Sequence, residues 1–347
     1  MRHGDMRATR WKPSSHQSGM KTSSIEVHNL VKRYGEIEAV RGIDLEVQQG
    51  EIFGFLGPNG AGKSTTIGIL ATLLKPTSGS ASVAGLNVEE DPGGVRARIG
   101  LVFQDPSLDD QLTARENLEF HAYLYGLSSS IRRERIDEAL AMVELTDRAS
   151  SPVKTYSGGM KRRLEIARGV LHYPQVLFLD EPTLGLDPQT RARIWEYLHG
   201  LRRREAITIF MTTHYMDEAE FCDRIAIIDH GSIVALGTPD QLKAQVGGDI
   251  VTVTTDNNAV AAEEIRQMFE LEPHVADGAL RMEVEDGASF LPLLLRKLSI
   301  PVSTVSLSRP SLDTVFIKLT GRTIREEEAG NLDHLRSMAS RWGGRRR

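Results

Sequence analysis

The loop GPNGAGKS at residues 57–64 carries the clearest chemistry in the chain. It joins an apolar run, residues 51–57, to a helical pattern. Its glycines let backbone N–H groups turn toward a ligand at a helix N-terminus, whose partial positive charge attracts phosphate. Lys63 adds a full charge directed at β- and γ-phosphates, and Ser64 offers a hydroxyl to Mg²⁺. The residues expected to bind a nucleoside triphosphate here are Gly57, Pro58, Asn59, Gly60, Ala61, Gly62, Lys63, Ser64 and Thr65.

Polar residues follow three more apolar runs. Residues 176–179 predict a buried strand that ends at Asp180, suited to a metal's water shell, and Glu181, which points elsewhere and can take a proton from water. Gln104 ends another apolar run, and His214 follows a third, where it would contact the γ-phosphate. The expected catalytic residues are Lys63, Gln104, Glu181 and His214, and the expected Mg²⁺ ligands are Ser64, Gln104 and Asp180.

The stretch YSGGMKR at residues 156–162 has the ingredients of a second phosphate site. Ser157 and the N–H groups of Gly158 and Gly159 precede a helix expected from about Met160. This stretch comes shortly before the strand at 176–179, so it is not built onto the face of the first loop. Its simplest use is to cover the nucleotide of another copy, which predicts a head-to-tail dimer with two shared sites.

The elements that position these residues read as an α/β fold. Runs that are apolar at consecutive positions predict a parallel sheet buried on both faces, whereas 24–30 and 43–47 alternate and predict an antiparallel β subdomain. A helical subdomain, about residues 105–160, is expected as an insertion. The runs read as strands of the parallel sheet are 51–57, 98–104, 175–181, 206–214 and 224–231.

The chain divides into four parts on composition and patterning. Residues 1–22 are polar and predict a disordered extension, within which Met20 is an alternative start to Met1. Residues 23–246 form the main α/β domain, and 247–321 alternate strand and helix patterns as a small acidic α+β domain. Residues 322–347 predict a disordered tail.

Bulk composition narrows the class of protein. A net charge of −5 gives no basic field for nucleic acid. The single cysteine, Cys222, permits no internal disulfide, is read as a small buried hydrophobe, and fits a reducing compartment. No apolar run approaches the ~18 residues of a membrane helix, and the N-terminus is not patterned as a secretory signal.

Over residues 24 to about 245 the sequence resembles the ABC ATPases. The match rests on the loop at 57–64, Gln104, YSGGM, VLFLDEP, the GLD at 185–187 and His214, which occur in the family's order. The resemblance implies that Tyr34 stacks on adenine. It also implies a dimer in which Ser157, Gly158, Gly159 and Asp187 act across the interface. Tyr156 and Met160 depart from the commonest signature, but Ser157–Gly159 is intact.

Other segments resemble the ATPase subunits of ABC-2-type exporters, in particular the daunorubicin/doxorubicin-resistance type. These are residues 71–79, 99–118 and 309–321. This resemblance implies efflux of a drug, antibiotic or lipid-like substrate through a membrane permease on a separate chain. It also implies a position at the cytoplasmic face of the cell membrane, with the ATPase paired with itself or with a homologue.

Other classes of P-loop protein remain as alternatives. An importer's ATPase would be distinguished by its substrate-binding protein and permease. A soluble ABC ATPase of DNA repair or translation would need a coiled-coil insertion or tandem cassettes, which the sequence lacks. A P-loop kinase does not need SGG, Gln104 and His214 together, and the guanine-specificity tetrad of GTPases is absent.

Two surface segments carry further hypotheses. Asp109, Asp110 and Gln111 are expected to contact a short cytoplasmic helix of the permease, with loop solubility as the alternative. The terminal GGRRR, residues 343–347, could meet anionic lipid, although a solvated tail is the simpler reading.

Overall fold

The computed structural model describes residues 22–105, 107–276 and 278–321. They fall into two compact units that divide between Val234 and Ala235. The predicted tail and all but the last residue of the predicted N-terminal extension lie outside the described residues. Within the described part of the chain, no helix is both long and apolar enough to cross a bilayer.

A six-stranded sheet forms the centre of the first unit, in the order β10-β9-β3-β8-β7-β6. The pairs β3–β8, β3–β9, β7–β8 and β6–β7 are parallel, as the consecutive apolar runs predict. β3, β7 and β8 are buried at every position. The bounds are β3 Ile52–Leu56, β6 Ile99–Val102, β7 Val176–Asp180, β8 Thr208–Thr213, β9 Arg224–Asp229 and β10 Ser232–Gly237.

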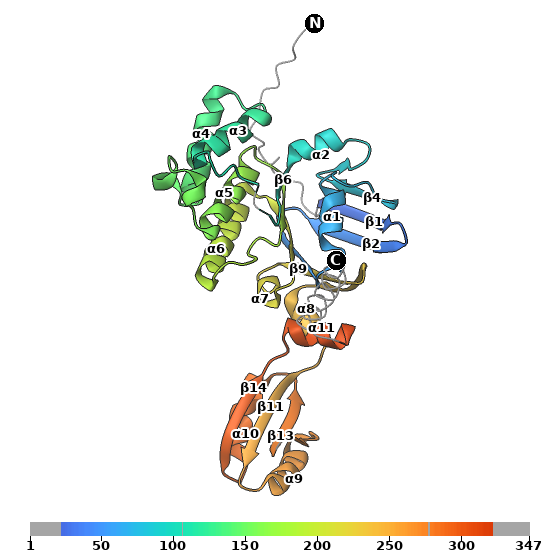
Figure 1. Cartoon of the computed structure of the whole chain (residues 1–347). Coiled ribbons are helices and arrows are strands. Elements are labelled where there is room, and N and C mark those ends of the chain that lie inside the picture. Colours follow the sequence, from blue (N-terminus) through green and yellow to red (C-terminus); the bar gives the residue numbers. More distant parts are fainter. Residues whose placement is uncertain (1–21, 106, 277, 322–347) are drawn as a thin grey trace, which may run out of the picture. The chain divides into compact units, whose positions relative to one another are not determined.

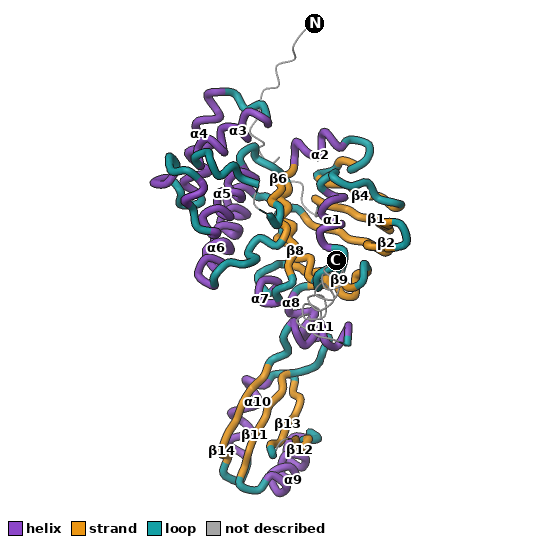
Figure 2. The backbone as a smooth tube through the Cα atoms, in the orientation of Figure 1, coloured by secondary structure: helices purple, strands orange, loops and turns teal. Residues whose placement is uncertain are grey.

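Alternate residues of the central strands pack into two different cores. Phe178 and Phe210 belong to the core that includes residues of α1, whereas Leu177 and Ile209 belong to the core that includes residues of α5 and α6. Figure 2 shows β6 and β8 between α1 and the pair α5 and α6. The bounds are α1 Lys63–Leu70, α5 Gly158–Val170, α6 Pro188–Glu205 and α7 Met216–Ala219.

Aromatic packing fixes the central strands side by side. The ring of Phe210 on β8 lies with its centroid 5.6 Å from Phe53, 5.5 Å from Phe55 and 5.7 Å from Phe178. All four side chains are fully buried. Because β3, β7 and β8 each lead into a predicted site segment, this cluster holds the starting points of those segments in place.

The expected antiparallel β subdomain is present as a separate sheet in the order β2-β1-β4-β5. β1 pairs antiparallel with both β2 and β4, and residues along β1 and β2 alternate between buried and exposed over much of their length. The bounds are β1 Ser23–Tyr34, β2 Ile37–Gln48, β4 Ser78–Val83, β5 Leu86–Asn87 and α2 Pro92–Arg98.

The inserted helical subdomain is also present, and its core contains Leu118, Leu140 and Leu164. α3 starts at a capping box in which Thr113 and Glu116 satisfy each other's backbone N–H groups. Figure 1 shows α3 and α4 side by side. The bounds are α3 Ala114–Leu124, α4 Ser129–Met142, and the 3₁₀ turns η1 Thr146–Arg148 and η2 Val153–Thr155.

The second unit is the expected α+β domain. Its antiparallel sheet has the order β12-β13-β11-β14. The unit begins twelve residues before the predicted boundary of 246/247, because α8 packs against α11 and buries Leu242. The bounds are α8 Pro239–Ala244, β11 Asp249–Thr255, α9 Asn258–Phe269, β12 His274–Ala276, β13 Ala279–Val284, α10 Gly287–Lys297, β14 Val302–Ser308 and α11 Leu312–Thr320.

Candidate functional site

The loop at 57–64 runs from the end of β3 into the first turn of α1. Gly62 caps this helix with φ +107°, and a Cβ there would lie 2.5 Å from the carbonyl oxygen of Ala39, so only glycine fits. Lys63 is 4% exposed, and its Nζ donates to the carbonyl oxygens of Gly57 at 2.8 Å and Pro58 at 3.1 Å. The loop therefore holds the ammonium group of Lys63 against its own backbone.

Asp180 ends β7, and one of its carboxylate oxygens accepts hydrogen bonds from two hydroxyl groups. Its Oδ1 lies 2.5 Å from Oγ1 of Thr212 and 3.3 Å from Oγ of Ser64. The Thr212 hydroxyl also accepts the backbone N–H of Glu181 at 3.0 Å. The sequence prediction missed Thr212, although its place near the end of β8, beside Asp180 in the sheet, is a usable signal.

Glu181 turns away from Asp180 toward two basic groups. Its Oε1 lies 3.3 Å from Nζ of Lys63 and 3.2 Å from Nδ1 of His214. Burial opposes its ionisation, but the hydrogen bond with His214 and the charge of Lys63 hold the pKa of Glu181 below its ordinary value. Its backbone is left-handed, with φ +45°, a conformation uncommon for residues other than glycine. The structure thus brings Lys63, Glu181 and His214 together.

Glu218 of α7 links the two segments that follow β7 and β8. Its carboxylate accepts hydrogen bonds from the hydroxyls of Thr183 and, at 2.7 Å, Thr213. Burial raises the pKa of this carboxyl group above its ordinary value. The sequence prediction missed Glu218, because a glutamate five residues beyond the strand carries no signal by itself. Through the Thr213 hydroxyl it contacts the residue that immediately precedes His214.

The second predicted phosphate site lies at the start of α5. The helix begins at Gly158, two residues before the predicted start at about Met160. The reason is that Ser157 caps the helix, its Oγ accepting the backbone N–H of Met160 at 3.3 Å, so both glycines join the first turn. Ser157 and Gly158 are exposed. Tyr156 is buried, and its hydroxyl donates to the carbonyl oxygen of Arg148.

Asp187 lies beside this stretch as the N-cap of α6. Its carboxylate accepts the backbone N–H of Thr190 at 3.0 Å and the Thr190 hydroxyl at 2.6 Å. The hydroxyl hydrogen bond is the main cause that lowers the pKa of Asp187 below its ordinary value. A Cβ on Gly159 would lie 2.4 Å from Cγ2 of Thr190. The start of α5 and the start of α6 are therefore in direct contact.

Two predicted residues are exposed and lie outside these contacts. Gln104 follows β6 and makes no hydrogen bond to another residue among those the structure describes. Tyr34 ends β1, is 46% exposed, and has Nζ of Lys32 5.1 Å from its ring centre. Both are accessible to a ligand, and their roles remain predictions.

Charged residues of α5 form hydrogen bonds with the segment that contains Gln104. Arg162 is 6% exposed and donates to the carbonyl oxygens of Phe103, Asp180 and Pro182. One turn further, the fully buried Glu165 accepts the backbone N–H of Ser107 at 2.8 Å.

Arg168 follows after another turn and donates to the carbonyl oxygen and hydroxyl of Ser107. The sequence prediction missed all three of these charged residues, which read as an ordinary basic helix. They connect α5 to the segments that carry Gln104 and Glu181.

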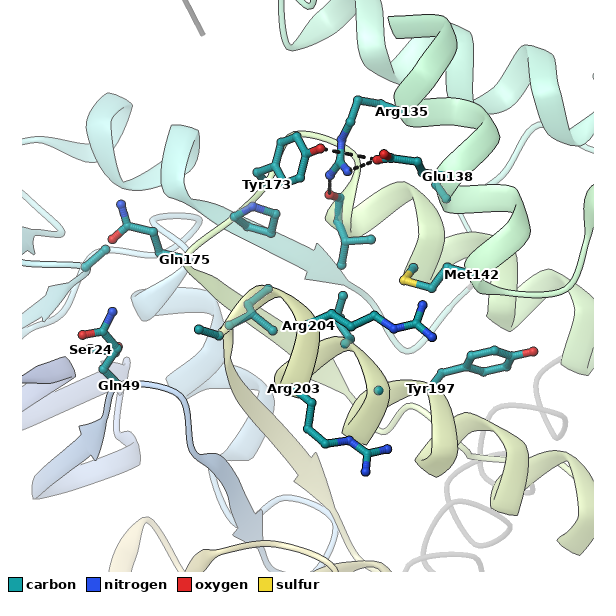
Figure 3. A pocket seen from close by; sticks show the side chains of 18 of the residues that line it. Ser24, Gln49, Arg135, Glu138, Met142, Tyr173, Gln175, Tyr197, Arg203 and Arg204 are labelled. Carbon is teal, nitrogen blue, oxygen red and sulfur yellow. Dashed lines mark hydrogen bonds and ion pairs between the residues drawn. The ribbon is translucent and has the colours of Figure 1, made fainter. Parts of the chain in front are cut away.

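A large cavity of about 1180 Å³ lies elsewhere in the first unit (Figure 3). None of the predicted site residues lines it. Gln175 and Ile207, which precede β7 and β8, place it at the amino ends of these strands, whereas Asp180 and Thr213 end them. On its wall Glu138 accepts hydrogen bonds from Arg135 at 2.6 Å and from the Tyr173 hydroxyl at 3.4 Å. The cavity is therefore separate from the candidate site.

The fold and the order of these motifs define an ATP-binding cassette ATPase. Residues 40–184 match the family described as ABC transporter, and residues 237–320 match the C-terminal domain of DrrA1-3-like ATP-binding proteins. The chain belongs to the ABC transporter family and is an ATPase subunit with a DrrA-like C-terminal domain.

Relatives match nearly the whole chain. The daunorubicin resistance ATP-binding protein DrrA2 of Streptomyces coeruleorubidus is 41% identical, over 88% of this chain and 98% of that protein. The linearmycin resistance ATP-binding protein LnrL of Bacillus subtilis is 38% identical, over 87% and 100%. A Nod factor export ATP-binding protein of Cupriavidus pinatubonensis is 38% identical, over 88% and 93%.

Solved structures match a little under two thirds of this chain. The ATP-binding subunit of an ABC transporter has a TM-score of 0.58 and 32% identity, over 64% of this chain and 92% of that one. A cassette in a dimeric post-hydrolysis state, bound to ADP and Pi, has a TM-score of 0.56 and 31% identity, over 62% and 98%. The expected fold class is confirmed.

Proposed function

We propose that this chain powers the efflux of a drug, antibiotic or lipid-like compound through a permease carried on a separate chain. The observation that carries the proposal is the match of 87–88% of this chain, cassette and C-terminal domain together, to relatives named for resistance or export. The test is an export assay in vesicles that contain the chain and its permease. Efflux that needs ATP and stops in the Glu181→Gln variant supports the proposal, and inward transport contradicts it.

ATP binding is assigned to the loop at 57–64. Its backbone N–H groups and Lys63 surround the phosphates, and Tyr34 stacks on the adenine. The γ-phosphate competes with Glu181 for the ammonium group of Lys63, since these two side chains are in contact. Glu181, so released, accepts a proton from the attacking water, while His214 contacts the γ-phosphate.

The donor set beside the phosphates fits Mg²⁺. The Ser64 hydroxyl and the Asp180 carboxylate converge to 3.3 Å, and Mg²⁺ is usually held by one or two carboxylates together with phosphate oxygens and water. Gln104 is exposed and lies two residues beyond the end of β6. It is proposed as a further ligand. When bound, the ion neutralises charge on the phosphates.

A second copy completes the site in this proposal. Ser157, Gly158 and Gly159 cover the nucleotide of the other subunit, and Asp187 acts across the same interface. What supports this is that Ser157 and Gly158 are exposed at the start of α5, where backbone N–H groups favour anions. Because ATP contacts both subunits only in the closed dimer, ATP binding favours closure.

Light scattering on the purified Glu181→Gln protein tests this dimer. A shift from monomer to dimer on adding ATP and Mg²⁺ is expected, and Ser157→Arg should abolish it. Ser128→Arg is the matched control, because Ser128 is also an exposed N-cap serine in the helical subdomain. A dimer that forms equally well with Ser157→Arg contradicts the assignment.

Permease contact is proposed for the exposed loop at Asp109, Asp110 and Gln111. Asp110 already forms an ion pair with Lys161 of α5, at 2.7 Å, whereas the Asp109 carboxylate accepts the nearby backbone N–H of Gln111. Asp109→Lys is therefore the variant that leaves the ion pair between Asp110 and Lys161 in place. It should uncouple transport while basal ATPase activity remains.

The matching test at Asp110 combines Asp110→Lys with Lys161→Asp, which restores the ion pair with its charges exchanged. Loss of transport in this double variant supports a permease contact. Normal transport in both variants contradicts it.

A further inference from the structure

The proposed catalytic residues Glu181 and His214 come from two separate segments of the chain. Glu181 follows β7 and His214 follows β8, and Oε1 of Glu181 lies 3.2 Å from Nδ1 of His214. Two side chains on separate segments keep a productive geometry only where the segments are fixed to each other, since a misplacement of about 1 Å can lower a rate about 100-fold. The structure provides two further links between these segments.

The first link is the carboxylate of Glu218, which is 3% exposed. It accepts hydrogen bonds from the hydroxyl of Thr183, in the segment after β7, and from the hydroxyl of Thr213, the last residue of β8. The Thr213 hydroxyl in turn accepts the backbone N–H of Tyr215 at 3.0 Å. These bonds fix the backbone on both sides of His214, but none of them reaches its imidazole.

The second link joins Tyr215, the residue after His214, to Arg191 near the start of α6. The guanidinium carbon of Arg191 lies 4.3 Å from the centre of the Tyr215 ring, which is a cation–π distance. The same ring lies beside the imidazole of His214, with 4.1 Å between the ring centres. The Tyr215 ring therefore contacts both the proposed catalytic imidazole and a cation on α6.

Arg191 is held in place by contacts outside its own helix. Its Nε donates to the carbonyl oxygen of Leu186 at 3.3 Å. Arg191 is the fourth residue of α6, and the helix dipole opposes a cation so close to a helix N-terminus. The contacts with Leu186 and with the Tyr215 ring offset this cost. The placement of the charge thus points to a role toward Tyr215 rather than within α6.

We propose that Tyr215 and Arg191 are positioning residues for ATP hydrolysis. The guanidinium of Arg191 holds the ring of Tyr215, and this ring holds the imidazole of His214 in the orientation that it needs beside Glu181. Neither Tyr215 nor Arg191 contacts ATP in this arrangement. Both act through His214, whose proposed role at the γ-phosphate the arrangement presupposes.

Steady-state ATPase assays on the purified full-length protein test the ring of Tyr215. Tyr215→Leu removes the ring and should lower kcat about tenfold, with KM for ATP within about twofold of the wild type, because the loop at 57–64 is unchanged. Tyr215→Phe keeps the ring and should stay within about twofold of the wild type in kcat. The reason is that the Tyr215 hydroxyl has no hydrogen-bond partner among the residues that the structure describes. Equal kcat values for Tyr215→Leu and Tyr215→Phe overturn the proposal.

Arg191→Met tests the cation in the same assay. The change removes the charge but keeps most of the side chain's length, and it should lower kcat about threefold or more with little change in KM for ATP. Arg193→Met is the matched control, because Arg193 is an exposed residue of the same helix. Thermal denaturation checks that each variant is folded at the assay temperature. A kcat for Arg191→Met equal to that of Arg193→Met contradicts the role of the cation.

A double variant shows whether the two residues act along one route. If Arg191 acts through the Tyr215 ring, Arg191→Met should lower kcat no further once Tyr215→Leu is present. Independent residues would instead give losses that multiply. Multiplied losses would therefore show that Arg191 does not act through Tyr215, and the proposal would fall.

His214→Ala separates a failure of this positioning role from a failure of the proposed function. His214→Ala should lower kcat about tenfold or more. If it does not, the role of His214 at the γ-phosphate is wrong, and the roles of Tyr215 and Arg191 fall with it. If His214→Ala slows hydrolysis and Tyr215→Leu does not, only the positioning role is overturned.

Discussion

The ammonium group of Lys63 lies 3.3 Å from a carboxylate oxygen of Glu181, and the same oxygen lies 3.2 Å from Nδ1 of His214. One buried carboxylate therefore joins three segments that are far apart in sequence. These contacts hold the pKa of Glu181 below its ordinary value despite its burial. Glu181 is thus ionised at neutral pH, as its proposed role of proton acceptor requires.

The first prediction concerns this carboxylate. Glu181→Gln should lower kcat for ATP hydrolysis by about 10²- to 10⁴-fold, because the amide cannot accept the proton. ATP should bind at least as tightly, since Lys63 no longer pairs with a charged side chain. Steady-state ATPase assays and nucleotide titrations measure the two effects. Glu119→Gln, an exposed change on α3, is the control, and a Glu181→Gln rate within tenfold of wild type contradicts the assignment.

The second prediction concerns α5. Arg162→Lys should lower kcat about tenfold or more with little change in KM for ATP, because lysine cannot donate to Phe103, Asp180 and Pro182 together. Arg163→Lys is the control on the same turn, where the guanidinium contacts Val143 and Glu144 instead. The split between kcat and KM separates loss of positioning from loss of binding. Equal kinetic effects in both variants would show that the loss reflects a general disturbance of α5 and not the loss of these three hydrogen bonds.

The third prediction concerns the contact between α5 and α6. Gly159→Ala should lower the melting temperature, because its Cβ would lie 2.4 Å from Cγ2 of Thr190. Adding Thr190→Ser removes that methyl group and keeps the hydroxyl that binds Asp187, so it should restore stability. Gly158→Ala meets its nearest atom at 3.8 Å and should be neutral or stabilising by up to about 1 kcal/mol. Thermal denaturation of the wild type, the two glycine variants and the double variant measures these effects. A double variant that is as unstable as Gly159→Ala alone contradicts the packing argument.

The fourth prediction concerns acid stability. Burial lowers the pKa of both His121 and His172 to about 4. The unfolded chain binds these protons near pH 6.5, so the folded state loses stability as the pH falls from about 6.5 to 4.

His172→Gln keeps a donor for the carbonyl oxygen of Ile99, which lies 2.9 Å from the imidazole. It should lower the slope of unfolding free energy against pH in this range by up to about 1.4 kcal/mol per pH unit. Denaturant unfolding at several pH values measures the slope. A slope equal to that of the wild type would show that His172 is protonated in the folded protein.

The sequence predicted the parts of the fold that depend on short-range patterns. β7 and β8 are apolar at consecutive positions, and the loop before Lys63 is rich in glycine, so their structures followed directly. The start of α5 was placed late because the Ser157 cap outweighs the low helix propensity of two glycines. The unit boundary depends on α8 packing against α11, some seventy residues later, which no local pattern reveals.

The same limit explains which site residues were missed. Lys63, Asp180, Glu181 and His214 stand in motifs, so their residue types and neighbours identify them. Arg162 looks like any solvent-facing arginine of a basic helix, and only the fold shows that it is buried among backbone carbonyls. Positioning residues contact backbone rather than substrate, and backbone contacts leave no signature in sequence.

The left-handed backbone of Glu181 has a consequence for how this position can change over time. Glycine would relieve that strain, but Glu181→Gly would also remove the carboxylate that lies 3.3 Å from the buried ammonium group of Lys63, which costs stability. The same change would remove the proton acceptor that we propose. Two separate demands, the buried charge of Lys63 and the proposed proton transfer, therefore oppose glycine at this position.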